Sequence, residues 1–515
     1  MPDRIPTPIK SRAGSARERR GAPPTRQWNF PENGAVLAAC CSITTTRGTT
    51  VPRRKTPVQR RGSVHLLLLS CTLCASCATQ NLKVEKPQQT PPIVGRQGPL
   101  PANTGDQLLE SALGELNEDA DVRALIEAVR KAASAPLISG NRVVPLVDGP
   151  ATFAAINAAM EAARHHIHVE TFIFDDDELG QEFAEVLVRK RREGIEVRVL
   201  YDSVGSMETK AAFFDGLRAH EIEVREFRPM NPAETPLLWK IQNRDHRKII
   251  VVDGNVGFTG GINVSATYSS PSSTSPGPKR GLSDGWRDTH ARIEGPAVAR
   301  LQELFIQMWA RAGEQTSFCC AAEYFPAIPP VGEHLVTIVV NDSEDDQDRS
   351  LYATYLAAFT QASSRLWITH AYFAPTEDLL DAMTAAAQRG VDVRLIVPGF
   401  TDSNLILHAT RSNYTRLLKR GVHIYERKDA LLHAKSVVID GAVSIVGSAN
   451  LDMRSFVHND EVNAIVVSRD FALRMEEIFQ QDQQASRPLD LASWKRRPLW
   501  QRLKESASRW MGYWL

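Results

Sequence analysis

One short pattern occurs twice in this chain of 515 residues and constrains its fold more than any other feature. The first copy is His246-Arg247-Lys248 with Asp253 five residues further on, and the second is His433-Ala434-Lys435 with Asp440 at the same distance. Seven residues after each Asp the copies match again, as Gly260-Gly261-Ile262-Asn263 and Gly447-Ser448-Ala449-Asn450. A single H-x-K-x4-D pattern is a weak signal, but a duplicate with the same spacing indicates an internally repeated chain.

Strand and helix patterns alternate on both sides of the motifs, which predicts an α/β fold. In the first half we expect helices near 151–164, 181–193, 210–220 and 297–311, and strands at 166–174, 196–202, 248–253, 256–259 and 289–293. In the second half we expect strands at 335–341, 366–373, 391–397, 422–425, 435–439, 444–446 and 461–467, with helices at 351–361, 376–389 and 405–419. The repeat predicts two domains, over residues 136–330 and 331–490.

Strand geometry indicates how each motif is used. Residues two apart in a β-strand point to the same face, so the His and Lys of one motif can reach one ligand. The four residues between each Lys and Asp are mostly apolar and suit a buried strand. Asp253 and Asp440 then lie about 17 Å away at the far end of the strand. We expect these two carboxylates to bind backbone or a basic partner rather than substrate.

The residue types suit the chemistry of a phosphodiester. Its negative charge repels nucleophiles, so a metal-free enzyme needs fixed cations and hydrogen-bond donors around the phosphoryl oxygens. The candidate phosphate ligands are Lys248, Lys435, Asn263, Asn450 and Ser448. One imidazole can attack phosphorus and a second can protonate the departing alkoxide, because an ordinary pKa of about 6.5 lets His hold either state near neutrality.

With these motifs the chain resembles the phospholipase D superfamily, and within it the bacterial cardiolipin synthases. The resemblance covers roughly residues 140–515. It also rests on Gly285-Trp286-Arg287-Asp288-Thr289-His290, Thr401-Asp402-Ser403, Arg411-Ser412-Asn413-Tyr414 and Asn450-Leu451-Asp452-Met453-Arg454-Ser455. It implies two tandem α/β-sandwich domains with mixed sheets, related by a pseudo-twofold axis and sharing one active site.

The resemblance also implies a ping-pong reaction. His246 attacks the phosphorus of one phosphatidylglycerol while His433 protonates the departing glycerol; His433 then activates the head-group hydroxyl of a second phosphatidylglycerol to give cardiolipin. Residue types leave the order of the two His open, and His246 is the usual first choice in the superfamily. The candidate catalytic set is His246, Lys248, Asp253, His433, Lys435 and Asp440. We expect no cofactor and no metal, since no Cys/His cluster or EF-hand spacing is present in the sequence.

Three further carboxylates are candidates for the site. The resemblance implies that a carboxylate orients each imidazole, and Asp288, which follows His246 by 42 residues, and Glu461, which follows His433 by 28, are the candidates. The alternative for both is an ordinary surface carboxylate. Glu170 lies mid-strand and either lines the pocket or is a buried structural residue.

Two other functions use the same residues. A phospholipase D hydrolase would release phosphatidic acid with water as acceptor, and the choice depends on how well the pocket excludes water. A nuclease is the third possibility, but 61 basic against 60 acidic residues give a charge of +1 and no field that attracts nucleic acid. We therefore expect a phospholipid partner and no nucleic acid. The internal repeat also makes an oligomer unnecessary for building the site.

The N-terminal region has the composition of a secretion signal. Residues 1–62 hold thirteen Lys or Arg against three acids and are expected to be a disordered or mis-assigned extension, with translation starting at Val51. Residues 63–80 form a short apolar segment typical of a signal peptide, and Cys77 is a candidate lipidation site. Residues 81–135 are expected to be a linker with a short helix. This predicts a membrane-associated protein of the bacterial cell envelope, on the periplasmic side.

The C-terminal residues 491–515 favour a lipid substrate. They contain Trp494, Trp500, Trp510 and Trp514, four of the nine Trp of the chain, together with six basic residues and one acid, Glu505. As a helix after Pro498, they present an apolar face flanked by basic residues, which suits the interface of an anionic membrane. The alternative is a helix docked on the protein's own surface.

Overall fold

The computed structural model describes residue 82 and residues 89–230, 242–272, 285–313, 321–345 and 347–510. The expected N-terminal extension, the apolar segment 63–80 and Cys77 lie outside the described residues. So do residues 511–515 of the expected C-terminal tail.

The first half is a mixed sheet whose strands run in the order β6-β5-β4-β7-β8-β9-β3. Three strands, β4, β5 and β6, are parallel, and the others pair antiparallel. The strands are β3 (Leu137–Val147), β4 (His166–Thr171), β5 (Glu196–Asp202), β6 (Glu223–Phe227), β7 (Ile249–Val252), β8 (Val256–Gly260) and β9 (Thr289–Glu294).

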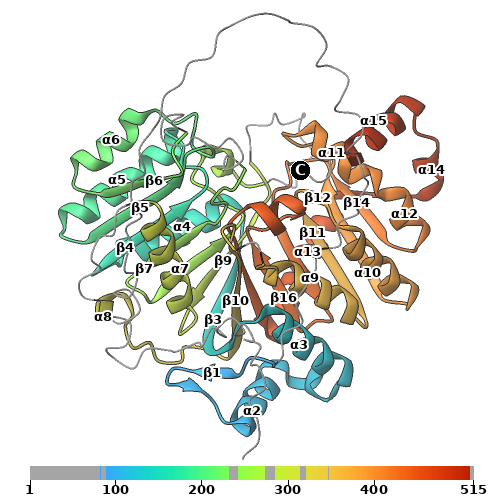
Figure 1. Cartoon of the computed structure of the whole chain (residues 1–515), viewed down its shortest axis with the longest axis horizontal. Helices are drawn as coiled ribbons and strands as arrows, with labels where there is room; N and C mark the ends of the chain where they lie inside the picture. Colours follow the sequence, from blue (N-terminus) through green and yellow to red (C-terminus); the bar gives the residue numbers. More distant parts are fainter. Residues whose placement is uncertain are drawn as a thin grey trace, which may run out of the picture.

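The second half repeats this order as β14-β13-β11-β15-β16-β18-β10. The strands are β10 (His334–Asn341), β11 (Arg365–His370), β13 (Asp392–Pro398), β14 (His423–Arg427), β15 (Lys435–Ile439), β16 (Val443–Gly447) and β18 (Glu461–Val467). A further strand, β19 (Ser486–Leu489), pairs with β14. Antiparallel pairing of β10 with β3 joins the two halves at the centre of the molecule (Figure 1). The predicted pair of mixed α/β domains is confirmed.

Helices cover both faces of the sheets. On one face of the first sheet lie α4 (Asp148–Glu161), α5 (Glu178–Arg192) and α6 (Ala211–Ala219), and on the other α7 (Val298–Arg311). The counterparts in the second half are α9 (Ser350–Gln361), α10 (Glu377–Gln388), α11 (Asn404–Ser412), α12 (Tyr414–Lys419) and α13 (Arg469–Gln484). Ile250 and Val252 of β7 face α4 while Ile249 and Val251 face α7, so a strand buried on both sides is apolar throughout.

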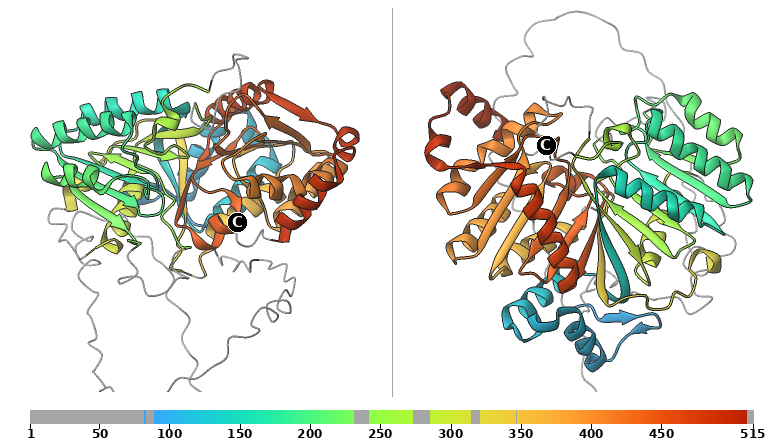
Figure 2. Two further views of the ribbon diagram at one scale, coloured as in Figure 1. Left: turned by 90° about the horizontal axis from the view of Figure 1, so that it is seen from above. Right: turned by 180° about the vertical axis from the view of Figure 1, so that it is seen from behind.

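A small N-terminal lobe differs from the linker and single short helix expected for residues 81–135. It contains the hairpin β1 (Ile93–Gly95) and β2 (Gly98–Pro99), then α2 (Ala102–Leu113), the 3-10 turn η1 (Gly114–Glu118) and α3 (Ala120–Ala133). Leu125, Ile126 and Val129 of α3 are buried in the core that includes α9. In Figure 2 this lobe, in blue, lies at one end of the molecule. Tertiary packing therefore makes two helices where local sequence predicts one.

Short elements complete the chain. These are η3 (Ala266–Tyr268), α8 (Ala321–Tyr324), the paired strands β12 (Phe373–Ala374) and β17 (Leu451–Asp452), the π-turn η4 (Arg454–His458), α14 (Leu491–Lys495) and α15 (Leu499–Trp510). Helix α15 packs against α11. Within the described parts of the chain, no helix combines the length and the apolar character needed to cross a bilayer.

Candidate active site

The two motifs meet where the halves join. A parallel bridge pairs Asp245 with Asp460, and a second pairs Arg287 with Leu432. Through these bridges the backbone N–H of His246 donates to the carbonyl of Asp460 at 3.0 Å, and that of His433 donates to the carbonyl of Arg287 at 2.7 Å. The next residue after each of these carbonyls is a candidate orienting carboxylate. Each motif is therefore placed beside the carboxylate of the opposite half.

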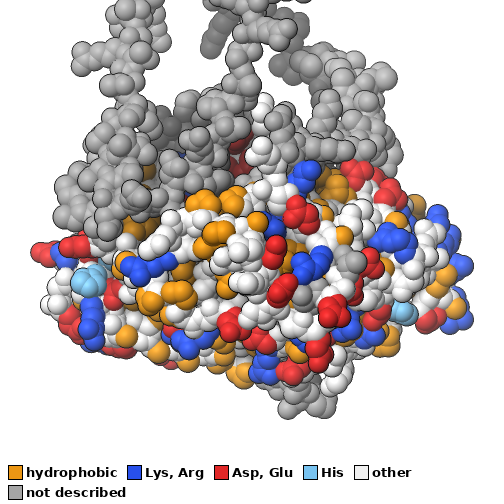
Figure 3. Space-filling model, turned by 90° about the horizontal axis from the view of Figure 1, so that it is seen from below, with side chains coloured by type: hydrophobic (Ala, Val, Ile, Leu, Met, Phe, Trp, Pro, Cys, Tyr) orange, Lys and Arg blue, Asp and Glu red, His pale blue; other side chains and the backbone are white. Residues whose placement is uncertain are grey.

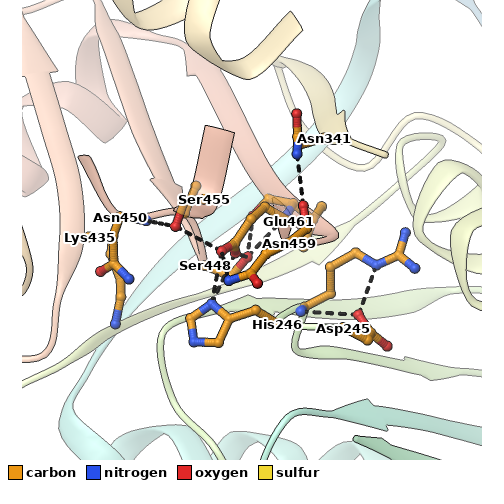
Figure 4. A network of polar contacts seen from close by, with 12 residues as sticks. Asp245, His246, Asn341, Lys435, Ser448, Asn450, Ser455, Asn459 and Glu461 are labelled. Atoms are coloured by element: carbon orange, nitrogen blue, oxygen red, sulfur yellow. Dashed lines mark hydrogen bonds and ion pairs between the residues drawn. The ribbon is translucent and has the colours of Figure 1, made fainter. Parts of the chain in front are cut away.

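His246 is held by Glu461, which lies at the start of β18 in the second half (Figure 4). The imidazole Nδ1 is 3.0 Å from Glu461 Oε1, and the Glu461 side chain is fully buried. Ser448 Oγ donates to the same carboxylate at 2.5 Å, Ser455 Oγ at 2.9 Å and Asn459 Nδ2 at 3.3 Å. Burial opposes ionisation, but His246, Lys248 and the Ser448 hydroxyl together lower the pKa of Glu461 to about 2. The group is a carboxylate at neutral pH.

His433 is held in the same way by Asp288, which belongs to the first half. Its Nδ1 is 2.7 Å from Asp288 Oδ2, and the backbone N–H of Thr289 donates to Asp288 Oδ1 at 2.7 Å. The Tyr268 hydroxyl lies 3.1 Å from the same imidazole nitrogen. Although burial acts in the opposite direction, His433 and Lys435 lower the pKa of Asp288. In both pairs the carboxylate occupies Nδ1, which leaves Nε2 as the nitrogen for chemistry.

The two motif lysines are buried close to the imidazoles. Each ammonium donates to the carbonyl of the His in its own motif at 2.6 Å, and Lys435 Nζ also lies 3.0 Å from His433 Nε2. Among the described residues, neither ammonium forms an ion pair with a carboxylate. Burial, reinforced by the charge of the other lysine, lowers the pKa of Lys248 to about 7, and burial lowers that of Lys435 to about 8. Contacts with backbone and imidazole, rather than a direct ion pair, therefore hold the two lysines.

In the site without substrate, burial favours the neutral form of both imidazoles. Burial and the Lys248 charge outweigh Glu461 and lower the pKa of His246 to about 4. Burial and Lys435 likewise lower the pKa of His433, against the opposing effect of Asp288. A neutral imidazole has the free electron pair that nucleophilic attack requires.

The residues of the G-[GS]-x-N elements lie beside the motifs but differ in their contacts. Asn263 Oδ1 accepts from the backbone N–H of Ile173 at 3.2 Å, and Asn450 Oδ1 is buried with no hydrogen-bond partner among the described residues. Ser448 differs from the phosphate-binding role expected of it, because its fully buried hydroxyl donates to Glu461. At the matching position, a Cβ on Gly261 would lie 2.2 Å from Asp288 Oδ1, so only glycine fits there.

Asp253 and Asp440 lie away from the imidazoles, at the far ends of β7 and β15. Asp253 accepts from the backbone N–H groups of residues 164, 165 and 166 at 2.8–2.9 Å. Asp440 accepts from those of residues 363, 364 and 365 at 2.8–2.9 Å. Each carboxylate therefore ties the start of the neighbouring strand, β4 or β11, to the motif strand. These contacts support the structural part assigned to them rather than contact with substrate.

Glu170 is fully buried and forms an ion pair with Arg247, its Oε1 lying 2.9 Å from the Arg247 Nε. Arg247 also binds Asp245, at 3.2 Å. Burial raises the pKa of Glu170 well above its usual value. The side chain belongs to a buried charge cluster with Arg247 and Asp245, and these contacts favour a structural role over a place in the pocket lining.

Aromatic residues that the sequence did not single out surround the imidazoles. The Phe172 ring lies 4.9 Å from the His246 ring, and the Lys248 ammonium lies 5.2 Å from the Phe172 ring centre. Trp286 and Tyr372 approach the His433 ring at 5.3 and 6.3 Å. Of these, only Trp286 stands within one of the side elements of the family pattern, so the others had no local signal.

Comparison with known proteins supports the same assignment. A family model described as "Cardiolipin synthase, PLD-like domain" matches residues 156–272 and 355–483. The cardiolipin synthase of Geobacillus thermodenitrificans (strain NG80-2) is 37% identical over 391 residues, which cover 75% of each chain. That of Halalkalibacterium halodurans is 34% identical over 386 residues, covering 75% of this chain and 74% of the relative.

A solved structure shares the fold at lower identity. The phosphatidylserine synthase of Haemophilus influenzae Rd KW20 superposes with a TM-score of 0.55 at 14% identity, and the match covers 76% of this chain and 100% of that one. With identities of 34–37% to the curated relatives, and with both motifs placed in one site by the crossed carboxylate pairs, the chain belongs to the cardiolipin synthase family of phospholipase D-like phosphatidyltransferases.

Proposed function

We propose that the site joins two phosphatidylglycerol molecules into cardiolipin and glycerol through a phosphatidyl-histidine intermediate. One observation carries this proposal: two imidazoles, each fixed at Nδ1 by a buried carboxylate of the opposite half, lie beside two buried ammonium groups that lack an ion-pair partner among the described residues. A phosphodiester would give both lysines a direct ion-pair partner. Two imidazoles of opposite role are what a double displacement at phosphorus needs.

In the first step, neutral His246 attacks the phosphorus of one phosphatidylglycerol through Nε2. The bond from phosphorus to the head-group oxygen breaks. His433, which takes up a proton when the anionic lipid binds beside it, gives that proton to the departing glycerol. Nδ1–H of His246 stays on the ring, so the phosphorylated imidazole is cationic. Glu461, at 3.0 Å, stabilises that charge.

In the second step, neutral His433 takes the proton of a head-group hydroxyl on a second phosphatidylglycerol. The alkoxide oxygen attacks phosphorus, the P–N bond to His246 breaks, and cardiolipin is released. Asp288 holds the His433 ring while its charge alternates between the steps. Lys248 and Lys435 hold the phosphoryl oxygens throughout, and Asn263 and Asn450 are proposed to assist them.

A donor with a good leaving group tests which His is the nucleophile. Phosphatidyl-p-nitrophenol needs no general acid for its first step, because p-nitrophenolate leaves unprotonated. His433→Ala is expected to release one equivalent of p-nitrophenolate in a burst, whereas His246→Ala gives none. The opposite pattern would exchange the two roles.

The overall reaction is tested by mass spectrometry of lipids after the purified protein is incubated with phosphatidylglycerol vesicles. The expected products are cardiolipin and glycerol, absent with His246→Ala. Phosphatidic acid without cardiolipin would assign the site to hydrolysis. No lipid turnover would make a nucleic acid phosphodiester the next substrate to test.

Helix α15 supports a membrane partner, which we include in the proposal. Leu499, Trp500 and Leu503 are 72%, 54% and 71% exposed, whereas the polar Glu505 and Ser508 of the same helix are buried. A helix with its apolar side outward suits insertion into a membrane interface. The side chains of Arg509 and Trp510 and all of residues 511–515 lie outside the described residues.

The position of α15 fits this role. It packs on α11, which follows the carboxyl end of β13. Lys435 lies at the same end of the sheet, because it pairs with the last residue of the neighbouring strand β11. On the first half, exposed Met207 and Met230 follow β5 and β6 at the corresponding end. Figure 3 shows the opposite end, where acidic, basic and hydrophobic side chains are interspersed. We propose that the end of the sheets that carries Lys435 and α15 faces an anionic membrane of the cell envelope, with Cys77 as a candidate lipid anchor. Release of the protein from phosphatidylglycerol vesicles by Trp500→Glu would test this orientation.

A further inference from the structure

Three aromatic side chains from separate segments converge on His433. The Tyr268 hydroxyl lies 3.1 Å from Nδ1, the Trp286 ring lies 5.3 Å from the imidazole at 48°, and the Tyr372 ring lies 6.3 Å away at 89°. Tyr268 and Trp286 also contact each other edge to face at 5.5 Å. The surroundings of His433 are therefore rich in aromatic rings, and Lys435 Nζ lies 3.0 Å from its Nε2.

A carboxylate, that of Asp402, is hydrogen-bonded to one of these rings. The Tyr372 hydroxyl donates to Asp402 at 2.8 and 2.9 Å, and Thr401 Oγ1 donates to Asp402 Oδ1 at 2.7 Å. Unlike Asp288 and Glu461, Asp402 is exposed to solvent, and none of the described Lys, Arg or His side chains forms an ion pair with it. Tyr372 links Asp402 to the reaction centre, because its hydroxyl binds Asp402 and its ring lies 6.3 Å from the His433 ring.

The proposed chemistry gives this place a specific ligand. His433 protonates the departing glycerol and later deprotonates the incoming head group, so both alcohols must lie beside the same imidazole nitrogen. A glycerol head group carries a second hydroxyl next to the reacting one. An exposed carboxylate without a cationic partner is a strong acceptor for such a hydroxyl.

Resting on the proposed function, we propose that Asp402, held in place by Tyr372 and Thr401, binds the free hydroxyl of the glycerol head group and selects a polyol as acceptor. Trp286 and Tyr372 pack against the carbon chain of the same group. The Thr401-Asp402-Ser403 segment is thus an acceptor-binding element. Water, which offers no second hydroxyl, gains nothing from Asp402, so the same contact favours transfer over hydrolysis.

A competition experiment measures this preference. The full-length protein is loaded from phosphatidyl-p-nitrophenol in the presence of equal concentrations of glycerol, 1-propanol and ethanolamine, and the phosphatidyl products are counted by mass spectrometry. All acceptors compete for one intermediate, so the product ratio does not depend on how fast that intermediate forms. Asp402→Ala is expected to lower the ratio of glycerol product to propanol product by about tenfold or more, as the loss of a hydrogen bond to a charged group does. Tyr372→Phe, which frees Asp402, is expected to lower it less.

A matched control exists in the same half. Tyr352 of α9 donates to Asp378 of α10 at 2.9 Å, so this pair has the same tyrosine–aspartate contact as Tyr372 and Asp402. Asp378→Ala should leave the product ratio unchanged. An unchanged ratio in Asp402→Ala would overturn the proposal, and so would an ethanolamine product that dominates in the wild type and disappears in this variant, since Asp402 would then be an ammonium site. Failure of the wild type to transfer to any alcohol would instead overturn the proposed function itself.

Discussion

Replacing Glu461 by Gln removes one negative charge from the site and little volume. The carboxylate lies 3.0 Å from His246 Nδ1 and is fully buried. At this distance, with an effective dielectric constant of about 20, the attraction between the carboxylate and a cationic imidazole is roughly 5 kcal/mol. Gln retains a hydrogen bond, so we expect a loss of about 4 kcal/mol in stabilising the phosphorylated ring, within the range measured when a buried charge pair is broken.

This loss corresponds to a rate of intermediate formation about 10³-fold below that of the wild type. The assay is single-turnover release of p-nitrophenolate from phosphatidyl-p-nitrophenol, which isolates the step at His246. Glu476→Gln is the matched control. Glu476 is also buried, but it lies on α13, away from the two imidazoles, and accepts a hydrogen bond from Arg365 of β11 at 2.9 Å. A Glu461→Gln variant that folds and reacts within tenfold of the wild type would refute the idea that this charge stabilises the intermediate.

Three further results are expected. Asp253→Ala removes an acceptor from three backbone N–H groups and should lower the free energy of unfolding by about 3 kcal/mol in urea titrations, with Asp253→Asn losing less. Ser448→Ala should lower kcat about tenfold by removing one donor to Glu461, whereas Gly261→Ser at the matching position should abolish activity, because its Cβ would overlap Asp288. Binding of inorganic phosphate should be accompanied by proton uptake that grows between pH 6 and 8. The lysines Lys248 and Lys435, with pKa values of about 7 and 8, become increasingly neutral in the empty site as pH rises, and a bound anion raises these pKa values. Calorimetry in buffers of different ionisation enthalpy measures the proton uptake, and no uptake at pH 8 would contradict the prediction.

Much of the fold follows from local patterns, and the exceptions have physical causes. The expected strands 196–202, 435–439 and 461–467 coincide with β5, β15 and β18. Strand β3 was not predicted because Gly140 and Pro145 interrupt its apolar pattern. Its strand conformation depends on pairing with β9 and β10. The single helix expected over 405–419 is two, α11 and α12, separated at Asn413.

The site was predictable in its members but not in its connections. Both orienting carboxylates were named from the family pattern, yet Glu461 is only 28 residues from His433 and 215 from His246, which it holds. Distance along the chain favours the wrong partner, and only the crossing of the halves brings the right one near. The environment of His433 was hidden for the same reason, since Tyr268, Trp286 and Tyr372 come from three separate segments.

The crossed pairs also determine when the protein becomes chemically competent during its synthesis. His246 is made long before Glu461, and until β18 has folded against β16 its ring has no carboxylate and no partner imidazole in place. A nascent or prematurely ended chain, which still exposes apolar segments to nearby lipid, therefore lacks the means to cleave it. Chains ending before Glu461 are expected to release no p-nitrophenolate from the activated lipid. An unfinished copy of the enzyme is in this way unable to break phosphodiester bonds.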